Sequence, residues 1–266
     1  MSSVSGSGES TAVRSVLTAL RTLEELSHGP RGVSELGRVL GVPKTTAHRS
    51  LRTLAQAGWV RPSEMDRAKW VLTARPLTVG LAGSVEGNLR ELARGELTKL
   101  RDATGETIHL VIPDPPDLVV VARVDGTNSL RTFLPLGTHA PLAATASGRA
   151  LLSAMSDAEV TEVLDAGLDR YTPTTILQRV EIQDAIALAR ERGYAVNEAE
   201  WRSDIAAIGV PVVARDGSPV AALAISMPLS RYEKADVASL AELAIGASRR
   251  IGDQLHDWKY SDTWIG

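Results

Sequence analysis

The sequence contains no cysteine and no long apolar run, and both absences restrict what the chain can be. Without cysteine there are no disulfides, thiolate metal sites or cysteine nucleophiles. No stretch approaches the roughly 20 apolar residues of a membrane span. The first residues are polar and rich in serine and glycine, unlike a signal peptide. We therefore expect a cytoplasmic protein that does not associate with membranes.

Recognisable catalytic and metal-binding patterns are also missing. Asp114, Asp117 and Asp125 lie near predicted turns, where acids are usually solvated, and residues 145–150 form neither a P-loop nor a nucleophile elbow. We expect no metal and no cofactor, and we expect His109 to be a structural histidine whose hydrogen bonds are satisfied. The histidines lack metal-ligand spacing; they are His28, His48, His109, His139 and His256.

The net charge of the chain is small, but the charged residues are unevenly distributed. The 266 residues carry a net charge of −3, with 44% hydrophobic and 23% charged residues, as in ordinary globular proteins with room for two domains. Residues 1–75 hold 11 basic and 6 acidic side chains (+5), whereas residues 76–266 hold 18 and 26 (−8). This division favours contact with nucleic-acid phosphates through the first part alone.

Residues 33–57 have the pattern of a helix-turn-helix. A short helix is followed by a turn at Gly41 and by a second helix, in which Ala47, Leu51 and Leu54 recur at spacings of four and three on one face. An apolar seam of this kind docks the helix and leaves its polar face free to enter a DNA groove.

Two short strands around a polar turn follow this motif, and together they predict a β-wing. Before it, residues 13–27 place Val16, Leu17, Leu20 and Leu23 on one helical face. We expect Ser34 to cap the helix that follows. The side chains expected to contact DNA are Ser34, Lys44, Thr45, Thr46, His48, Arg49 and Arg52 from the two helices and Arg61, Arg67 and Lys69 from the wing.

The second half pairs its strands instead of alternating them strictly with helices, which favours an α+β domain with an antiparallel sheet. The predicted strands are residues 107–112, 118–124, 130–134, 194–198, 208–214 and 220–227, and the predicted helices are 145–155, 157–165, 179–192 and about 231–256. The expected domains are a disordered tail (1–11), a winged helix-turn-helix (12–75), a loose hinge and linker helix (76–103), an effector-binding domain (104–258) and a second tail (259–266).

In order and spacing, the chain resembles IclR-type transcriptional regulators over residues 12–256. The matching stretches are residues 14–21, 41–49, 103–110, 141–150, 192–196 and 220–226. The resemblance implies a winged helix-turn-helix, a linker helix and a GAF-like effector-binding domain. It also implies homodimers or homotetramers on double-stranded, palindromic operator DNA.

The resemblance further implies an effector pocket around residues 145–150, where a helix start can hold an anionic or carbonyl oxygen. Structural alternatives are that Ser147 caps this helix, that Asn197 is a turn residue and that Trp201 packs in the core. The pocket residues carried over are Leu130 and Leu134 as apolar walls, with Ala146, Ser147, Gly148, Asn197, Trp201, Ala207, Ala224 and Ser226.

Three of these positions depart from the family pattern. Asn197 stands where the family often has aspartate, Ala207 where it often has cysteine, and Ala224 where it often has serine, while Ser226 is kept. The losses of polar groups favour a larger or less polar effector than a small 2-oxo acid, such as an aromatic compound or an amide.

We therefore expect a ligand-responsive, sequence-specific DNA-binding regulator, a repressor released by a small organic effector. A ligand-dependent activator of a catabolic operon is the first alternative. The others are an enzyme that uses the C-terminal pocket and an architectural DNA-binding protein without a ligand.

Overall fold

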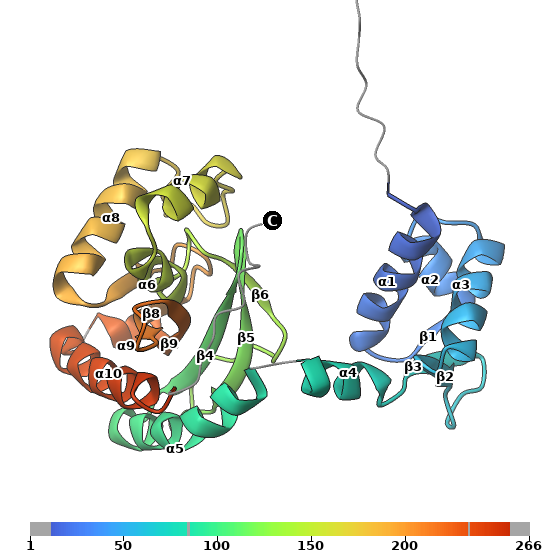
Figure 1. The fold of residues 1–266 in the computed structure, drawn as a ribbon, viewed down its shortest axis with the longest axis horizontal. Coiled ribbons are helices and arrows are strands. Elements are labelled where there is room, and N and C mark those ends of the chain that lie inside the picture. Colours follow the sequence, from blue (N-terminus) through green and yellow to red (C-terminus); the bar gives the residue numbers. More distant parts are fainter. Residues whose placement is uncertain (1–11, 84–85, 234, 256–266) are drawn as a thin grey trace, which may run out of the picture. The chain divides into compact units, whose positions relative to one another are not determined.

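The computed structural model describes residues 12–83, 86–233 and 235–255, and the chain divides between Ser84 and Val85 into two compact units. Figure 1 labels the elements of both units, and each unit is considered by itself. The tails predicted at 1–11 and 259–266 lie outside the described residues.

The first unit is a winged helix-turn-helix. Ala47, Leu51 and Leu54 are buried in its core with Leu26 and Leu36, so the predicted seam of the second motif helix is confirmed. A three-stranded antiparallel sheet in the order β1-β3-β2 forms the wing. The elements are α1 (Arg14–Ser27), β1 (Arg31–Gly32), α2 (Val33–Val39), α3 (Lys44–Gln56), β2 (Val60–Pro62), β3 (Lys69–Leu72) and α4 (Arg75–Gly83).

Two features of this unit differ from expectation. Ser34 does not cap α2, because the helix already begins at Val33 with Gly32 as its N-cap, and the Glu35 carboxylate reaches back to the Gly32 amide at 3.5 Å. The loose hinge expected after residue 75 is largely helical, since it forms α4.

The apolar face of α1 is only partly used inside the unit. Leu23 packs against the core, but Val16, Leu17 and Leu20 are 54%, 42% and 51% exposed. The buried positions of this helix are Thr22 and Leu26 instead. The helix therefore presents an apolar stripe that the unit itself leaves uncovered.

The second unit is built on a six-stranded antiparallel sheet in the order β6-β5-β4-β9-β8-β7. Its α+β class agrees with the pairing of strands in the sequence. The elements are α5 (Glu86–Thr104), β4 (Thr107–Asp114), β5 (Asp117–Val124), β6 (His139–Pro141), α6 (Ala146–Ala154), α7 (Asp157–Asp165), α8 (Arg179–Arg192), β7 (Ala195–Glu198), β8 (Ile205–Val213), β9 (Pro219–Pro228), α9 (Leu229–Tyr232) and α10 (Val237–Gly252).

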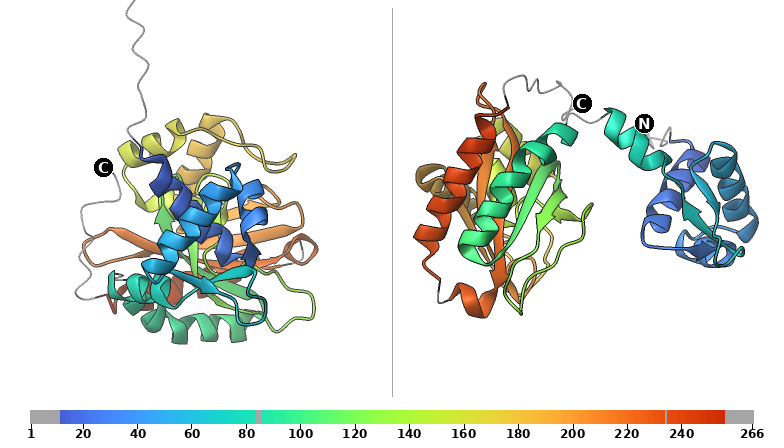
Figure 2. Two further views of the ribbon diagram at one scale, coloured as in Figure 1. Left: turned by 90° about the vertical axis from the view of Figure 1, so that its right-hand side faces the viewer. Right: turned by 90° about the horizontal axis from the view of Figure 1, so that it is seen from below.

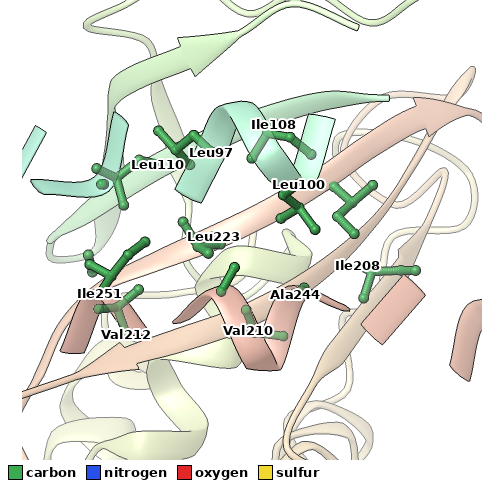
Figure 3. Close-up of a cluster of buried hydrophobic side chains, with 14 of the residues drawn as sticks. Leu97, Leu100, Ile108, Leu110, Ile208, Val210, Val212, Leu223, Ala244 and Ile251 are labelled. Atoms are coloured by element: carbon green, nitrogen blue, oxygen red, sulfur yellow. The ribbon is translucent and has the colours of Figure 1, made fainter. Parts of the chain in front are cut away.

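Helices cover both faces of this sheet. The helices α5 and α10 lie side by side on one face, and α6 rests on the other with α7 and α8 beyond it (Figures 1 and 2). On the α5/α10 face, apolar side chains from strands and helices interlock, among them Ile108, Leu110, Val210 and Leu223 (Figure 3). Because side chains alternate along a strand, the residues between these point toward α6.

Two predictions for this unit need correction. Residues 130–134 are not a strand, because they lie in the long connection between β5 and β6 and form no ladder with either strand. The single C-terminal helix expected from 231 is instead α9 and α10, with Asp236 capping α10 through the Ser239 amide at 3.2 Å. The helix predicted over residues 86–103 is present as α5, and it buries Leu89, Leu97 and other apolar residues in the core of the second unit. Its role as a linker stays a prediction.

Candidate functional sites

The helix α3 presents a polar face opposite its buried seam. Lys44, Thr45, His48, Arg49 and Arg52 are exposed, and Thr46 is half-buried. Within the described part of the chain, no ion pair involves a basic residue of this face. These cations and hydroxyls are therefore free to meet phosphates and base edges.

On the wing, Arg67 and Lys69 are exposed, and Arg61 forms an ion pair with Glu64 at 2.9 Å. To contact DNA, Arg61 must give up its ion pair with Glu64. Breaking an exposed ion pair of this kind costs little free energy in water. The hydroxyl of Ser34 lies on the exposed side of α2.

The second unit contains a cavity between its sheet and the start of α6. Its empty space amounts to about 550 Å³, including the part open to solvent. The lining residues from the sheet are His109, Val111, Leu118, Val120, Ala140, Asn197, Ile205, Ala207, Ala224 and Ser226, and those from α6 and the connections are Thr132, Leu134, Thr145, Ala146, Ser147, Trp201 and Arg202.

Small residues in register make the floor of the cavity. Ala224 on β9 pairs with His109 on β4 and with Gly209 on β8, and Ser226 pairs with Ala207 on β8. Residues that pair directly point to the same face of an antiparallel sheet. A methyl group or a single hydrogen at these central positions leaves space that larger side chains would fill.

Gly209 brings the start of α6 down onto the sheet. A Cβ atom at this residue would lie 2.4 Å from the backbone carbon and oxygen of Ala146, closer than any real contact. Gly148 is needed for a similar reason, because its Cβ would lie 2.1 Å from the Leu142 carbonyl oxygen. These two glycines set the position of the helix start over the sheet.

Thr145 is the N-cap of α6. Its hydroxyl accepts from the Gly148 amide at 3.1 Å and donates to the Pro141 carbonyl at 2.9 Å. Ser147 therefore does not cap the helix. Ala146 and Ser147 line the cavity. Both lie in the first turn of α6, where backbone amides have no acceptor within the helix.

Asn197 joins β7 to the segment ahead of α6. Its amide nitrogen donates to the Ala144 carbonyl at 2.6 Å, and the residue is buried. It lies within β7 and is not a turn residue. An ionised aspartate has no proton to donate. The amide therefore makes a bond here that the carboxylate frequent in the family cannot make.

The connection from β7 to β8 closes one side of the cavity with Trp201 and Arg202, whose guanidinium lies 4.7 Å from the centre of the indole ring. Just before this pair, the Thr172 hydroxyl donates to the Ala199 carbonyl, and the Thr175 hydroxyl donates to the Glu200 carbonyl at 2.6 Å. The Glu200 carboxylate also forms an almost fully buried ion pair with Arg149 of α6, at 2.6 Å.

His109 differs from the structural histidine that we expected. Its ring is 1% exposed, and Nδ1 lies 3.1 Å from the Ser226 hydroxyl. Its Nε2 has no hydrogen-bond partner among the described residues. Burial, followed by the charge of the Arg123 guanidinium, lowers the pKa of His109 to about 4. The imidazole is therefore neutral at physiological pH.

The structure brings eight of the ten predicted pocket residues to this cavity. Leu130 and Gly148 do not line it, since Leu130 is 62% exposed and Gly148 packs on Leu142. Sequence reasoning missed the contributions of β4, β5 and β6. The alternation of His109 and Val111 with Ile108 and Leu110 was the available signal, but it does not say which face carries a cavity.

Two further classes of site have no support in the described ranges. No cluster of three or more histidine, aspartate or glutamate side chains there could hold a metal ion. None of the described helices is long and apolar enough to cross a membrane.

The chain matches two family models. Residues 15–64 match the IclR helix-turn-helix domain, and residues 84–253 match the bacterial transcriptional regulator IclR C-terminal domain. The chain belongs to the IclR family of bacterial transcriptional regulators. Its family members are regulators, so the enzymatic alternative is set aside.

Individual relatives agree with this IclR assignment. The acetate operon repressor of Salmonella typhimurium is 31% identical over 244 residues, which cover 90% of this chain and 89% of the relative. An IclR transcriptional regulator from Alicyclobacillus acidocaldarius is 26% identical, with a TM-score of 0.77 over 91% of this chain and 98% of that one. An IclR homolog from Microbacterium hydrocarbonoxydans, solved in complex with 4-hydroxybenzoate, is 22% identical and shares the fold, with a TM-score of 0.78 over 90% and 96% of the two chains.

Proposed function

We propose that this regulator is a cytoplasmic repressor that leaves its operator when a small organic molecule binds in the cavity of the second unit. The observation that carries the proposal is the cavity itself, which lies in a chain whose other unit is a helix-turn-helix. Relatives named as repressors support the sign of regulation. Activation on ligand binding is the alternative and uses the same two sites.

In this proposal DNA is bound in two layers. Residues of α3 enter the major groove, and Arg61, Arg67 and Lys69 of the wing reach phosphates or the minor groove. The support is the exposed, ion-pair-free cationic face of α3 together with the excess of basic residues in the first 75 positions.

The cavity favours a neutral or anionic ligand. Its walls are mainly apolar, Arg202 is its one cationic residue, and no acidic side chain is among the described residues that line it. A carboxylate or carbonyl at the start of α6 would meet the amides of Ala146 and Ser147. Trp201 supplies a flat apolar surface suited to a ring.

We further propose that the protein binds its operator as a homodimer or homotetramer. A single helix-turn-helix reads few base pairs, and two-fold symmetry doubles the site. The exposed apolar stripe of α1, formed by Val13, Val16, Leu17 and Leu20, is a surface that a second copy can cover.

The proposed response is a shift between populations. Ligand binds one arrangement of the second unit better, and this preference changes the affinity of the first unit for DNA. The coupling cannot exceed the difference in ligand affinity between the two arrangements, typically about 1–3 kcal/mol.

Two variants test the DNA interface on a duplex that contains the promoter of the protein's own gene. If Arg49 reads a base, we expect Arg49→Ala to cost about 1–3 kcal/mol. Lys69→Ala, in contrast, should weaken binding evenly and reduce the slope against salt concentration. The readout is fluorescence anisotropy at several salt concentrations. Arg215→Ala, at an exposed arginine of the second unit, is the matched control. Parental affinity in both DNA-face variants would show that the face is wrongly assigned.

A further inference from the structure

One residue that lines the cavity, His109, has a ring nitrogen that makes no hydrogen bond within the described residues. The Nε2 atom of His109 is buried and without a hydrogen-bond partner among the described residues, and His109 lines the cavity. Buried polar atoms in proteins are almost always hydrogen-bonded. An unpartnered nitrogen on a residue that lines the cavity is therefore a position where a ligand atom can complete the bond.

The neutral ring can serve as donor or acceptor. The Ser226 hydroxyl, 3.1 Å from Nδ1, can either donate to that nitrogen or accept from it. If Ser226 donates, Nε2 carries the proton and donates to a carbonyl oxygen. If Ser226 accepts, Nε2 is free to accept from a hydroxyl. Both partners are uncharged, and a neutral imidazole offers no cation to offset a carboxylate.

The two polar ends of the cavity are separated by a distance that the strand register sets. His109 on β4, Ala224 on β9 and Gly209 on β8 lie in one row, and the start of α6 rests on Gly209. Adjacent strands are about 4.8 Å apart, so His109 and the helix start are separated by roughly 10 Å. The methyl group of Ala224 forms the floor between them.

Apolar side chains line the space around this floor, including Val111, Val120 and Leu134. A two- or three-carbon acid is too short to reach both ends of such a space. A single ring with a polar group at each end has the required length and apolar faces.

We propose that His109 is a specificity-determining residue, whose Nε2 binds an uncharged hydroxyl or carbonyl oxygen at one end of a ring-sized effector, while a carboxylate at the opposite end lies at the start of α6. This inference rests on the proposed function, because it assumes that the cavity is the effector site.

A matched pair of probes tests it. Benzoate and 4-hydroxybenzoate differ by one hydroxyl opposite the carboxylate, and isothermal titration gives the affinity of each for the full-length protein. A hydrogen bond to neutral Nε2 predicts that the parent prefers 4-hydroxybenzoate by about 3- to 10-fold. In His109→Phe, which keeps an aromatic ring but lacks both nitrogens, the preference should fall to about 1-fold, with benzoate affinity retained. Arg215→Ala, in the exposed turn between β8 and β9, is the control and should keep the parent's preference.

A second measurement covers a His109→Phe protein that does not fold. In the parent labelled with 15N-histidine, 4-hydroxybenzoate should shift the Nε2 resonance of His109, and benzoate should shift it much less. Equal preference in parent and variant, equal shifts with the two probes, or no binding of either probe at millimolar concentration would each overturn the inference.

The DNA readout separates this inference from the proposed function. Release of operator DNA by a probe that does not distinguish parent from His109→Phe would contradict the role of His109 and leave the regulator intact. Probes that bind with the expected preference but never alter DNA affinity would instead contradict the proposed ligand response.

Discussion

His109 affects the stability of the second unit and also belongs to its candidate site. The ring is buried in the central part of the sheet, where desolvation, followed by the charge of Arg123, lowers its pKa to about 4. An unfolded chain binds the proton with the ordinary pKa of about 6.5. Between these values the unfolded state holds more protons, so stability rises with pH across this window.

The stability of the second unit is therefore expected to fall as pH decreases from 6.5 to 4. The contribution of His109 is fully present above pH 6.5 and is lost toward pH 4, by up to about 3 kcal/mol. Urea denaturation at several pH values, comparing the parent with His109→Phe, isolates this contribution. His139→Gln, at an exposed histidine, should behave as the parent. An identical pH profile in His109→Phe and the parent would contradict the assignment.

At the residue scale, the sequence predicted which positions meet but not always what each one does. The resemblance placed Ser147 and Asn197 at the cavity, and both line it. Their bonding could not be read from the chain, because Thr145 takes the cap that Ser147 was thought to supply and Asn197 bonds a carbonyl 53 positions away. Such pairings depend on tertiary approach, which local patterns do not record.

At the scale of elements, periodicity succeeded where one face of a helix or strand is buried. It predicted α3 and most strands of the second unit. It was wrong for residues 130–134, a short segment with three apolar side chains whose backbone pairs with no neighbouring strand. Hydrogen-bonded pairing is a non-local property, so a short apolar segment alone does not establish a strand.

The close approach of α6 and β8 gives a prediction at this scale. In Gly209→Val, side-chain atoms would overlap the backbone at Ala146, and the start of α6 must lift from the sheet. Overpacking of this kind typically costs about 1–3 kcal/mol, measured by chemical denaturation.

Gly95→Ala is the control for that experiment. Gly95 lies in α5 with nothing within 4 Å of its added Cβ, and alanine in a helix should stabilise by about 0.5–1 kcal/mol. Undiminished stability of Gly209→Val would show that α6 does not rest on β8 as described.

The uncovered stripe of α1 gives a second prediction for an element. Leu17→Glu and Leu20→Glu together should weaken self-association and operator binding, because they place charges in the apolar contact that we propose between copies. Light scattering and DNA anisotropy measure the two effects, and circular dichroism checks the fold. Leu243→Glu on α10, a similarly exposed leucine, is the control. Unchanged mass and DNA affinity in the double variant would place the contact elsewhere.

At the scale of the whole molecule, the two units differ in the sign of their net charge. The excess of basic residues lies in the unit with the helix-turn-helix, and the acidic excess lies in the unit with the cavity. Motif order along the chain was enough to predict both units and their family. The chemistry of the ligand was not predictable to the same extent, because the cavity combines side chains from six strands, α6 and three connections.

The measurement that tests the central claim most directly is DNA release by a ligand in the parent and in Ala224→Trp. Anisotropy of a labelled promoter duplex is followed while 4-hydroxybenzoate, or another compound that raises the melting temperature of the parent, is added. The account predicts release from the parent and none from Ala224→Trp, whose indole fills the cavity floor, with operator affinity without ligand nearly unchanged. An Ala224→Trp protein that folds normally and still releases DNA on ligand addition would contradict it.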